Sequence, residues 1–186
     1  MQIPTDLSKY DNSGFDAGAG QLKRGLWFVV NACFFISYNP FNSLKLFLLR
    51  LFGAEVGTGV VIKPGVNIKY PWKLNIGNYV WIGEKVWIDN LDRVEIGNSV
   101  CISQGAMLLC GNHDYKKSTF DLITGKIILE DGVWIGAKAI VCPGVTCFFH
   151  SVLTVNSVAS KNMESNSVYT GNPAIKIKDR SVSNSA

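Results

Sequence analysis

The chain has 186 residues, of which 47% are hydrophobic and 17% charged, so it is long and apolar enough to bury a core and too apolar to be disordered. Its formal net charge is +4, without a dense lysine or arginine run, which argues against nucleic acid as a partner. Five scattered cysteines without a C-x-x-C pair argue against a disulfide framework or a zinc ribbon. With no signal-peptide pattern at its start, the chain is expected to be cytoplasmic.

The first 55 residues differ from the rest of the chain. Residues 1–20 are polar and contain glycine, which predicts an extended or disordered arm. Residues 21–55 hold two short apolar stretches separated by Asn39 and Pro40, and neither reaches the ~20 apolar residues that span a bilayer. We expect a helical segment that packs on the main domain or on a neighbouring subunit. The alternative is a helix pair, residues 21–52, that lies on a membrane surface.

A six-residue repeat begins at Val56 and continues to about Val158. An aliphatic residue recurs every six positions, and a small or β-branched residue follows it four positions later. Three such hexads make one coil of three short strands, with the aliphatic side chains inside and permissive residues in the turns. The repeat therefore predicts an all-β fold, a parallel β-helix over residues 56–164. The tail, residues 165–186, is expected to pack on this β-helix.

The interruptions of the repeat share a phase. Coils are expected to start at Val56, Ile76, Ile96, Leu129 and Cys147, and the repeat is least regular around Phe148. The extra residues are 74–75, 94–95 and a long loop, 114–128, and each insertion follows the third hexad of its coil. They should therefore lie on one edge of the prism. Long loops on a rigid scaffold commonly carry function.

His113 stands at the root of the largest insertion, and a histidine that titrates near neutral pH suits a general base. Asp89 and Asn90 lie one coil below on the same face and could orient a substrate or the imidazole, although both residue types also favour turns. Cys110 precedes His113 by three residues, so the two side chains point to opposite faces of a strand and do not form a nucleophilic pair. His150 is interpreted as structural.

Several segments resemble one enzyme family. Residues 111–115 (GNHDY), 133–137 (VWIGA), 143–146 (PGVT) and 171–174 (GNPA), together with the hexads, resemble the hexapeptide-repeat acetyltransferases that act on galactosides, maltose and Nod factors. Residues 48–54 (LLRLFGA) and 70–74 (YPWKL) are similar to the subgroup of colanic acid biosynthesis acetyltransferases. The resemblance extends from about residue 14 to about residue 178.

This resemblance implies a left-handed β-helix and a homotrimer that binds acetyl-CoA between neighbouring prisms, without a metal. It implies an O-acetyltransferase of surface polysaccharide synthesis, in which His113 takes the proton of a sugar hydroxyl and the hydroxyl attacks the thioester directly. Asp89 occupies the position of an asparagine in other members, so Asn90 could serve instead. The cofactor positions carried over from the family are Ala137, Val155, Ser160, Lys161 and Lys178.

Two other functions fit a β-helix. A zinc hydratase of this fold uses three histidines, whereas this chain has two, placed in different coils. A non-catalytic scaffold or membrane-associated assembly protein would keep the prism without the chemistry. The retained His113 and the long insertion beside it favour the enzyme.

Overall fold

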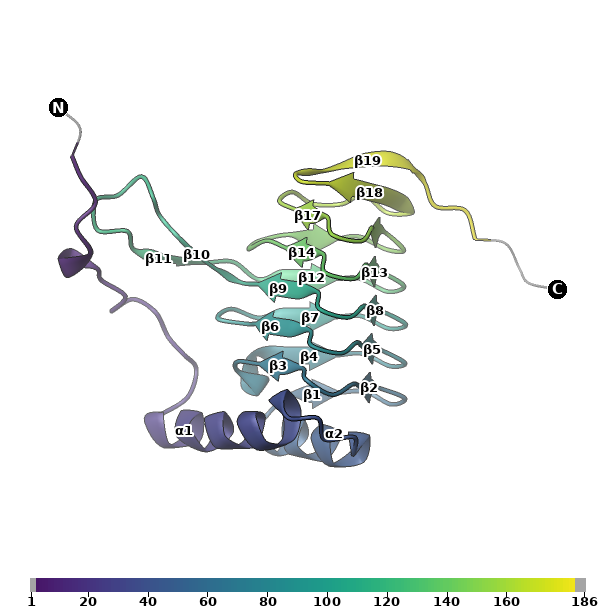
Figure 1. The fold of residues 1–186 in the computed structure, drawn as a ribbon, viewed down its shortest axis with the longest axis horizontal. Coiled ribbons are helices and arrows are strands. Elements are labelled where there is room, and N and C mark those ends of the chain that lie inside the picture. The colour runs from purple at the N-terminus through teal and green to yellow at the C-terminus, as the bar shows by residue number, and fades with distance from the viewer. Residues whose placement is uncertain (1–2, 183–186) are drawn as a thin grey trace.

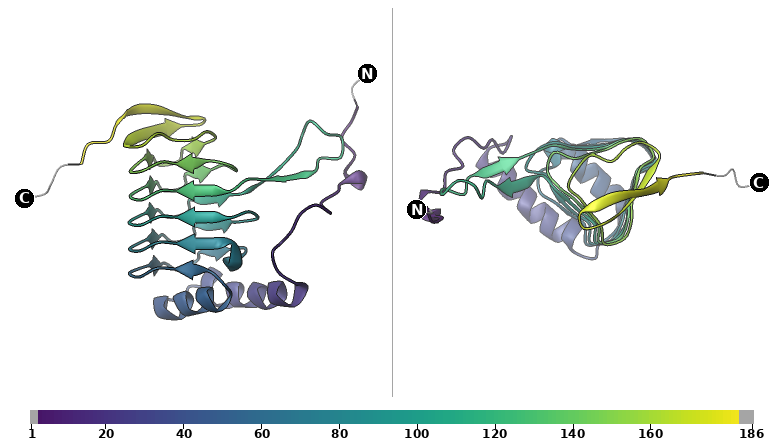
Figure 2. Two further views of the ribbon diagram at one scale, coloured as in Figure 1. Left: turned by 180° about the vertical axis from the view of Figure 1, so that it is seen from behind. Right: turned by 90° about the horizontal axis from the view of Figure 1, so that it is seen from above.

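A computed structural model describes residues 3–182. The chain forms a left-handed parallel β-helix of stacked triangular coils, with two helices across one end and a β-hairpin across the other (Figures 1 and 2). The ends of the expected arm and tail, residues 1–2 and 183–186, lie outside the described part of the chain. The all-β fold predicted from the repeat is confirmed.

Each face of the prism is a parallel sheet built from one short strand per coil. The first face orders its strands β1-β4-β7-β12-β15, with bounds Glu55–Val56, Leu74–Ile76, Val94–Ile96, Ile127–Leu129 and Thr146–Cys147. The second face is β2-β5-β8-β13-β16-β18, with bounds Val61–Ile62, Trp81–Ile82, Cys101–Ile102, Trp134–Ile135, Val152–Leu153 and Ser167–Gly171. The third face is β3-β6-β9-β14-β17, with bounds Asn67–Ile68, Trp87–Asp89, Met107–Leu109, Ile140–Val141 and Val158–Ala159.

The register of the coils follows the predicted starts. Val56 pairs with Ile76, Ile76 with Ile96, Ile96 with Leu129, and Leu129 with Cys147. These five side chains stack along the inside of the prism, where each aliphatic row excludes water along the whole stack. The last coil keeps this register, so the irregular sequence around Phe148 does not distort it.

The turns between the first and second faces explain that irregularity. Residues there adopt a left-handed backbone in successive coils, and His150 occupies the same corner position as Gly132 one coil below. A Cβ atom on Gly132 would lie 2.2 Å from the imidazole of His150, so the glycine leaves room for the ring. His150 also stacks on Phe149, with ring centroids 4.2 Å apart. Its role in this corner is structural.

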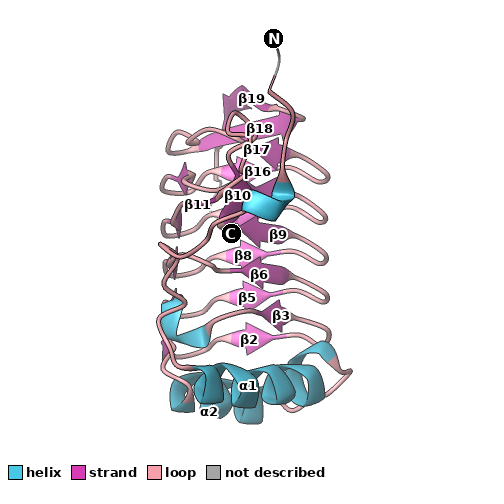
Figure 3. Ribbon diagram, turned by 90° about the vertical axis from the view of Figure 1, so that its left-hand side faces the viewer, coloured by secondary structure: helices cyan, strands magenta, loops and turns pink. Residues whose placement is uncertain are grey.

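Helix α1 (Gln21–Val30), the π-helical turn η2 (Asn31–Ile36) and helix α2 (Asn42–Leu51) close the lower end of the prism (Figures 1 and 3). The side chains of Trp27, Phe35 and Leu49 are buried against the first coil. The Trp27 indole donates a hydrogen bond to the Ile68 carbonyl at 2.8 Å. The buried ammonium group of Lys45 donates to the carbonyls of Ile62 and Lys63. These contacts satisfy carbonyl groups on the free edge of the first coil.

The three insertions leave the same edge of the prism, between the third and first faces, as their phase predicts. The first is the 3-10 turn η3 (Pro71–Lys73), the second is a short bend at residues 90–93, and the third is an antiparallel hairpin, β10 (Gly111–His113) and β11 (Leu122–Thr124). The expected positions 74–75 and 94–95 are corrected: they lie in β4 and β7, because Leu74 and Val94 are buried in the core. The hairpin begins and ends earlier than the expected loop 114–128, because Ile127 and Leu129 already point into the core. It projects away from the prism (Figure 1).

The N-terminal arm crosses this edge. It contains the 3-10 turn η1 (Leu7–Lys9) and runs from α1 to the tip of the hairpin, where the Asp6 amide donates to the Ser118 carbonyl at 2.7 Å (Figure 1). The Trp72 indole donates to the Ala17 carbonyl at 2.7 Å, and the Lys73 ammonium group donates to the Asp16 carbonyl at 2.6 Å. The arm is therefore held by the first and third insertions.

The upper end of the prism is closed by a hairpin. Strand β18 extends the second face in parallel to β16, and β19 (Ala174–Asp179) folds back antiparallel to β18. Cys147 also forms a bridge with Met163, so the sixth coil begins before the residues expected to form the tail. Residues after Ser167 thus belong partly to the β-helix itself.

Candidate active site

His113 lies in β10, in the hairpin that forms the third insertion at the edge between the third and first faces. Antiparallel pairing places His113 opposite Leu122 and brings Phe120, at the turn of the hairpin, back over the imidazole. The two rings stack with centroids 4.5 Å apart and planes 8° from parallel. The Tyr10 ring of the arm packs against the imidazole at an angle of 56°, with 5.8 Å between centroids. Two aromatic side chains thus fix the plane of the His113 ring.

One ring nitrogen of His113 has a defined partner. Nδ1 lies 3.0 Å from the carbonyl oxygen of Phe120, which can only accept a hydrogen bond. The proton of a neutral imidazole is therefore held on Nδ1, and Nε2 carries the free lone pair. Phe120 has a left-handed backbone, with φ of 53°, which is uncommon for a residue with a side chain and helps to turn its carbonyl toward the ring. This arrangement suits a general base.

His113 lines a cleft of about 540 Å³ between the arm, the hairpin and the coils. Arg24 enters it from α1, and among the described residues Arg24 has no ion-pair partner. The lining residues are Tyr10, Asn12, Phe15, Arg24, Lys69, Tyr70, Asp89, Leu91, Gly111, Asn112, His113 and Leu122. Both polar groups and aromatic rings line the cleft, so it can hold a ligand through hydrogen bonds and stacking.

Asp89 lies in this cleft, one coil below the start of the hairpin. Its carboxylate forms an ion pair with Lys69, with Nζ and Oδ1 separated by 2.9 Å. Both residues line the cleft, where the Lys69 side chain is 40% exposed and that of Asp89 is 13% exposed. The structure brings Asp89 and His113 to one cavity but gives them different hydrogen-bonding partners.

Asn90 has a different place from the one expected. It is fully buried, and its amide oxygen accepts from the Tyr70 amide at 2.9 Å while its amide nitrogen donates to the Tyr70 carbonyl at 2.5 Å. Both functional groups of the side chain are used to hold the coil below. Asn90 is therefore not available to orient a substrate, and the expectation that it could replace Asp89 is corrected.

Cys110 is buried at the base of the hairpin. Desolvation raises the pKa of its thiol to about 12, so the sulfur stays protonated and is a poor nucleophile near neutral pH. The Cys110 thiol is therefore not suited to act as the nucleophile that the sequence raised as an alternative. Within residues 3–182, no group of three or more histidine, cysteine, aspartate or glutamate residues is placed to hold a metal ion.

The five residues carried over for acetyl-CoA occupy three places. Ala137 and Val155 lie in consecutive turns of the corner between the second and third faces, where the Asn156 amide donates to the Ala137 carbonyl at 2.9 Å. Ser160 and Lys161 follow β17 at the edge that carries the insertions, and Lys178 is in β19. Val155 is 65% exposed, and both lysines are also exposed. One prism alone does not gather all five residues.

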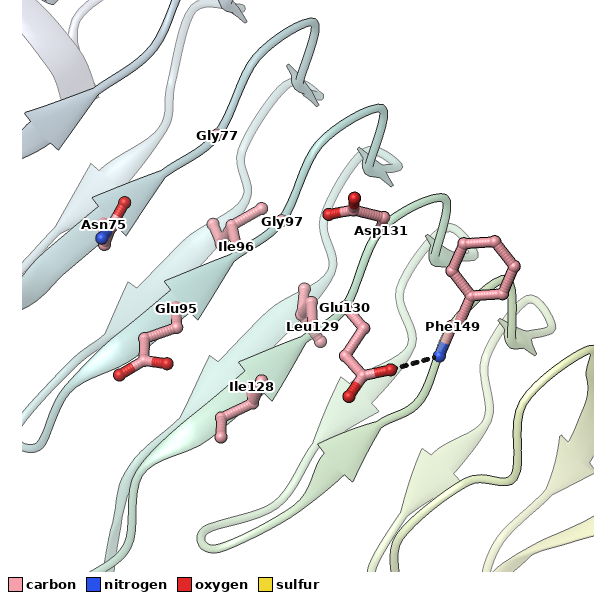
Figure 4. A pocket seen from close by; sticks show the side chains of 10 residues that line it. All are labelled: Asn75, Gly77, Glu95, Ile96, Gly97, Ile128, Leu129, Glu130, Asp131 and Phe149. Carbon is pink, nitrogen blue, oxygen red and sulfur yellow. Dashed lines mark hydrogen bonds between the residues drawn. The ribbon is translucent and has the colours of Figure 1, made fainter.

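A second hollow of about 510 Å³ lies on the first face (Figure 4). Its carboxylates are Glu95, Glu130 and Asp131, and Glu130 accepts a hydrogen bond from the Phe149 amide at 2.8 Å. None of the residues predicted for catalysis or for acetyl-CoA lines it. The cleft beside His113 is therefore the better candidate for the active site.

The sequence predicted His113 and Asp89 but not the two aromatic residues that fix the imidazole. Phe120 lies inside the expected loop, and its contact with His113 depends on the register of a hairpin that no repeat specifies. Tyr10 comes from a segment without a recognisable pattern. Its position follows from tertiary contacts of the arm, so no signal in the sequence could have placed it.

The fold and the cleft are those expected of an acyltransferase of the left-handed β-helix class, and comparison with known proteins assigns the chain to that class. No family model matches the chain. WcaF of Escherichia coli strain K12, provisionally named a colanic acid biosynthesis acetyltransferase, is 37% identical over 177 residues, which cover 91% of this chain and 97% of WcaF. Nodulation protein L of Rhizobium meliloti is 30% identical, covering 69% of this chain and 72% of that protein.

The fold also matches solved structures. The hexapeptide-repeat acetyltransferase VCA0836 of Vibrio cholerae O1 biovar eltor, solved with acetyl coenzyme A, has a TM-score of 0.80 at 21% identity, covering 90% of this chain and 93% of that one. The similarity to WcaF shows that this chain belongs to the family of colanic acid biosynthesis acetyltransferases among the hexapeptide-repeat acetyltransferases. The resemblance inferred from the sequence is confirmed.

Proposed function

We propose that this protein is an acetyl-CoA-dependent O-acetyltransferase that modifies a sugar hydroxyl in surface polysaccharide biosynthesis. The observation that carries the proposal is the geometry of His113, whose Nδ1 is held by the Phe120 carbonyl while Nε2 is left free in a cleft of about 540 Å³. Family membership supports acetyl transfer, and the relative WcaF is named for a polysaccharide pathway.

In the proposed reaction, Nε2 of His113 takes the proton of the acceptor hydroxyl as the oxygen attacks the acetyl carbonyl. The new bond joins the sugar oxygen to the acetyl carbon, the carbon–sulfur bond breaks, and the proton passes from the imidazole to the leaving thiolate. A sugar hydroxyl is a poor nucleophile near neutral pH, and a positioned base contributes about 10²–10⁴-fold. Asp89, paired with Lys69, would position the acceptor rather than accept the proton.

Acetyl-CoA would be held by the five residues predicted from the family, and a homotrimer would bring them together. Ala137 and Val155 lie at one corner of the third face, whereas His113 is on the hairpin at its other edge. A donor bound at the first corner would thus meet His113 of a neighbouring prism more readily than that of its own chain. Lys161 and Lys178 would bind the phosphates of coenzyme A as exposed cations.

The proposal predicts that His113→Ala lowers acetyl transfer by at least about a hundredfold, because the proton no longer has an acceptor. Release of free coenzyme A should be measured with a thiol reagent, using acetyl-CoA and a panel of free, nucleotide-linked and lipid-linked sugars. Calorimetry should show that the variant still binds coenzyme A. His150→Gln is the matched control and should keep its activity, since that imidazole packs in a corner of the β-helix.

The alternative is a scaffold without catalytic activity. It would be favoured if the wild-type protein neither bound coenzyme A nor released it with any acceptor. Full activity of the His113→Ala variant would instead reject the general-base role while leaving acetyl transfer intact. The cytoplasmic location expected from the sequence stays a prediction.

A further inference from the structure

The helices at the lower end of the prism have a second apolar side. Leu22, Val29 and Cys33 lie on the side of α1 and η2 opposite the buried Trp27, and Phe47 and Leu51 lie opposite the buried Leu49 of α2. We call the exposed apolar side chains of this end the basal face. Its members are Leu22, Leu26, Val29, Cys33, Tyr38, Phe41, Phe47 and Leu51; Phe28 and Ile36 are left out because they line a hollow beside the third face.

The exposure of the basal face is high for such large side chains. Leu22 is 79% exposed, Phe41 is 67% exposed and Leu51 is 64% exposed. A helix in a monomeric soluble domain usually shows polar residues on its outer side, and large contiguous apolar patches generally mark an interaction surface. Because α1 and α2 both lie across the end of the stack (Figures 1 and 3), the basal face points away from the coils, in the direction of the prism axis.

The charge of this end is uniform. Residues 17–54 contain the cations Lys23, Arg24, Lys45 and Arg50 and no acidic residue, so the entire net charge of +4 resides in this segment. Arg50 donates to the carbonyls of Val56 and Gly57, which are neutral groups. In the described part of the chain none of the four cations has an ion-pair partner. Lys45 is buried against the first coil and Arg24 lines the cleft, whereas Lys23 and Arg50 are exposed. The positive field beside the basal face therefore comes from Lys23 and Arg50.

We propose that the basal face binds an anionic membrane surface, with the side chains of the face inserted among the acyl chains and the exposed cations Lys23 and Arg50 close to the lipid phosphates. A second copy of the chain fits less well, because face-to-face contact would bring two positive fields together. A partner protein would need no anionic bilayer, so the lipid composition distinguishes the two. Within residues 3–182 no helix is long and apolar enough to cross a bilayer, which leaves a helix pair lying in the interface.

Membrane binding would place the cleft beside His113 at a set height above the lipid. The cleft begins near α1, where Arg24 lines it, and extends up to the hairpin. An acceptor sugar carried on a lipid could then reach the imidazole without leaving the membrane. This consequence rests on the proposed function, whereas the binding itself does not.

The test is flotation of the full-length protein in a density gradient with vesicles of phosphatidylcholine alone or with added phosphatidylglycerol. We expect the wild-type protein to float with the anionic vesicles, since each cation near the surface strengthens binding by about fivefold. The double variant Val29→Glu and Phe47→Glu should lose at least about tenfold in bound fraction, because both side chains, each 58% exposed, would carry a charge into the bilayer.

The matched control is the double variant Ile175→Glu and Ile177→Glu, which makes the same changes at exposed positions of β19 on the opposite end of the prism. It should float like the wild-type protein. Unchanged thermal unfolding of the basal variant would show that it folds. The proposal is overturned if the wild-type protein stays unbound with anionic vesicles, if the basal variant floats equally well, or if phosphatidylcholine alone binds equally well. It is also overturned if the basal variant dissociates a larger assembly.

Discussion

At the scale of single residues, the candidate site depends on side chains whose partners are backbone groups. The His113 imidazole is oriented by the Phe120 carbonyl, and the Asn90 amide holds both backbone groups of Tyr70. Substitution of the Phe120 or Tyr70 side chain would leave these backbone groups in place. The roles of His113 and Asn90 are therefore tested by substituting His113 and Asn90 themselves.

Replacing Asn90 should test its structural role. Asn90→Ala leaves the part-buried amide and carbonyl of Tyr70 without their Asn90 partners, and we expect the free energy of unfolding to fall by about 2–4 kcal/mol. The measurement is urea unfolding followed by circular dichroism. Asn75→Ala is the control, because that exposed amide donates only to the exposed Glu55, and it should change stability by less than about 0.5 kcal/mol. Equal stability of both variants would contradict the assignment.

At the scale of elements, the repeat predicted the strands and the edge of the insertions but not the shape of the largest one. Each hexad repeats the same pattern of inward-facing aliphatic residues. The pairing of Cys147 with Leu129 could therefore be expected despite the irregular residues that follow. The β10–β11 hairpin obeys no repeat, and its antiparallel register decides that Phe120 meets His113. The arm is similar, since hydrogen bonds from Trp72 and Lys73 determine its path.

The arm makes a prediction about acceptor binding. Tyr10→Ala removes an aromatic wall of the cleft and one neighbour of the imidazole, so we expect the KM for the acceptor to rise by about 2–10-fold. The KM for acetyl-CoA should stay unchanged, because none of the predicted donor positions lines this cleft. Steady-state kinetics with each substrate varied in turn separates the two. Tyr38→Ala, at an exposed tyrosine of the basal face, is the control. A parallel rise in both KM values would exclude a specific role for the arm.

At the scale of the whole molecule, the outer side of the second face exposes aromatic side chains that do not contribute to the core of a single chain. Trp81 is 55% exposed and Trp134 is 46% exposed, and they occupy the same row two coils apart, with Cys101 between them. Exposed tryptophans on a rigid flat sheet are typical of protein interfaces. The face that carries them adjoins the corner with Ala137 and Val155, where the proposed trimer would bind its donor.

The proposed trimer gives a prediction for this face. Analytical ultracentrifugation of the wild-type protein should give three times the chain mass of 20.4 kDa. Trp81→Glu would place a charge in the interface, and we expect it to shift the protein to the mass of one chain and to lower acetyl transfer. The circular dichroism spectrum should stay unchanged, because the side chain points away from the core and the variant still folds. A variant that stays trimeric would show that the copies meet through another face.

Both ends of the β-helix are closed, and this has a consequence for assembly. A stack of coils could grow without limit, since every terminal coil offers a row of open backbone groups to another chain. Here α1, η2 and α2 occupy one end, and the β18–β19 hairpin occupies the other. End-to-end stacking of chains into fibres is therefore blocked. Association through the faces of the prism remains possible. Copies can gather around an axis parallel to the prism, which would turn all their basal faces in one direction.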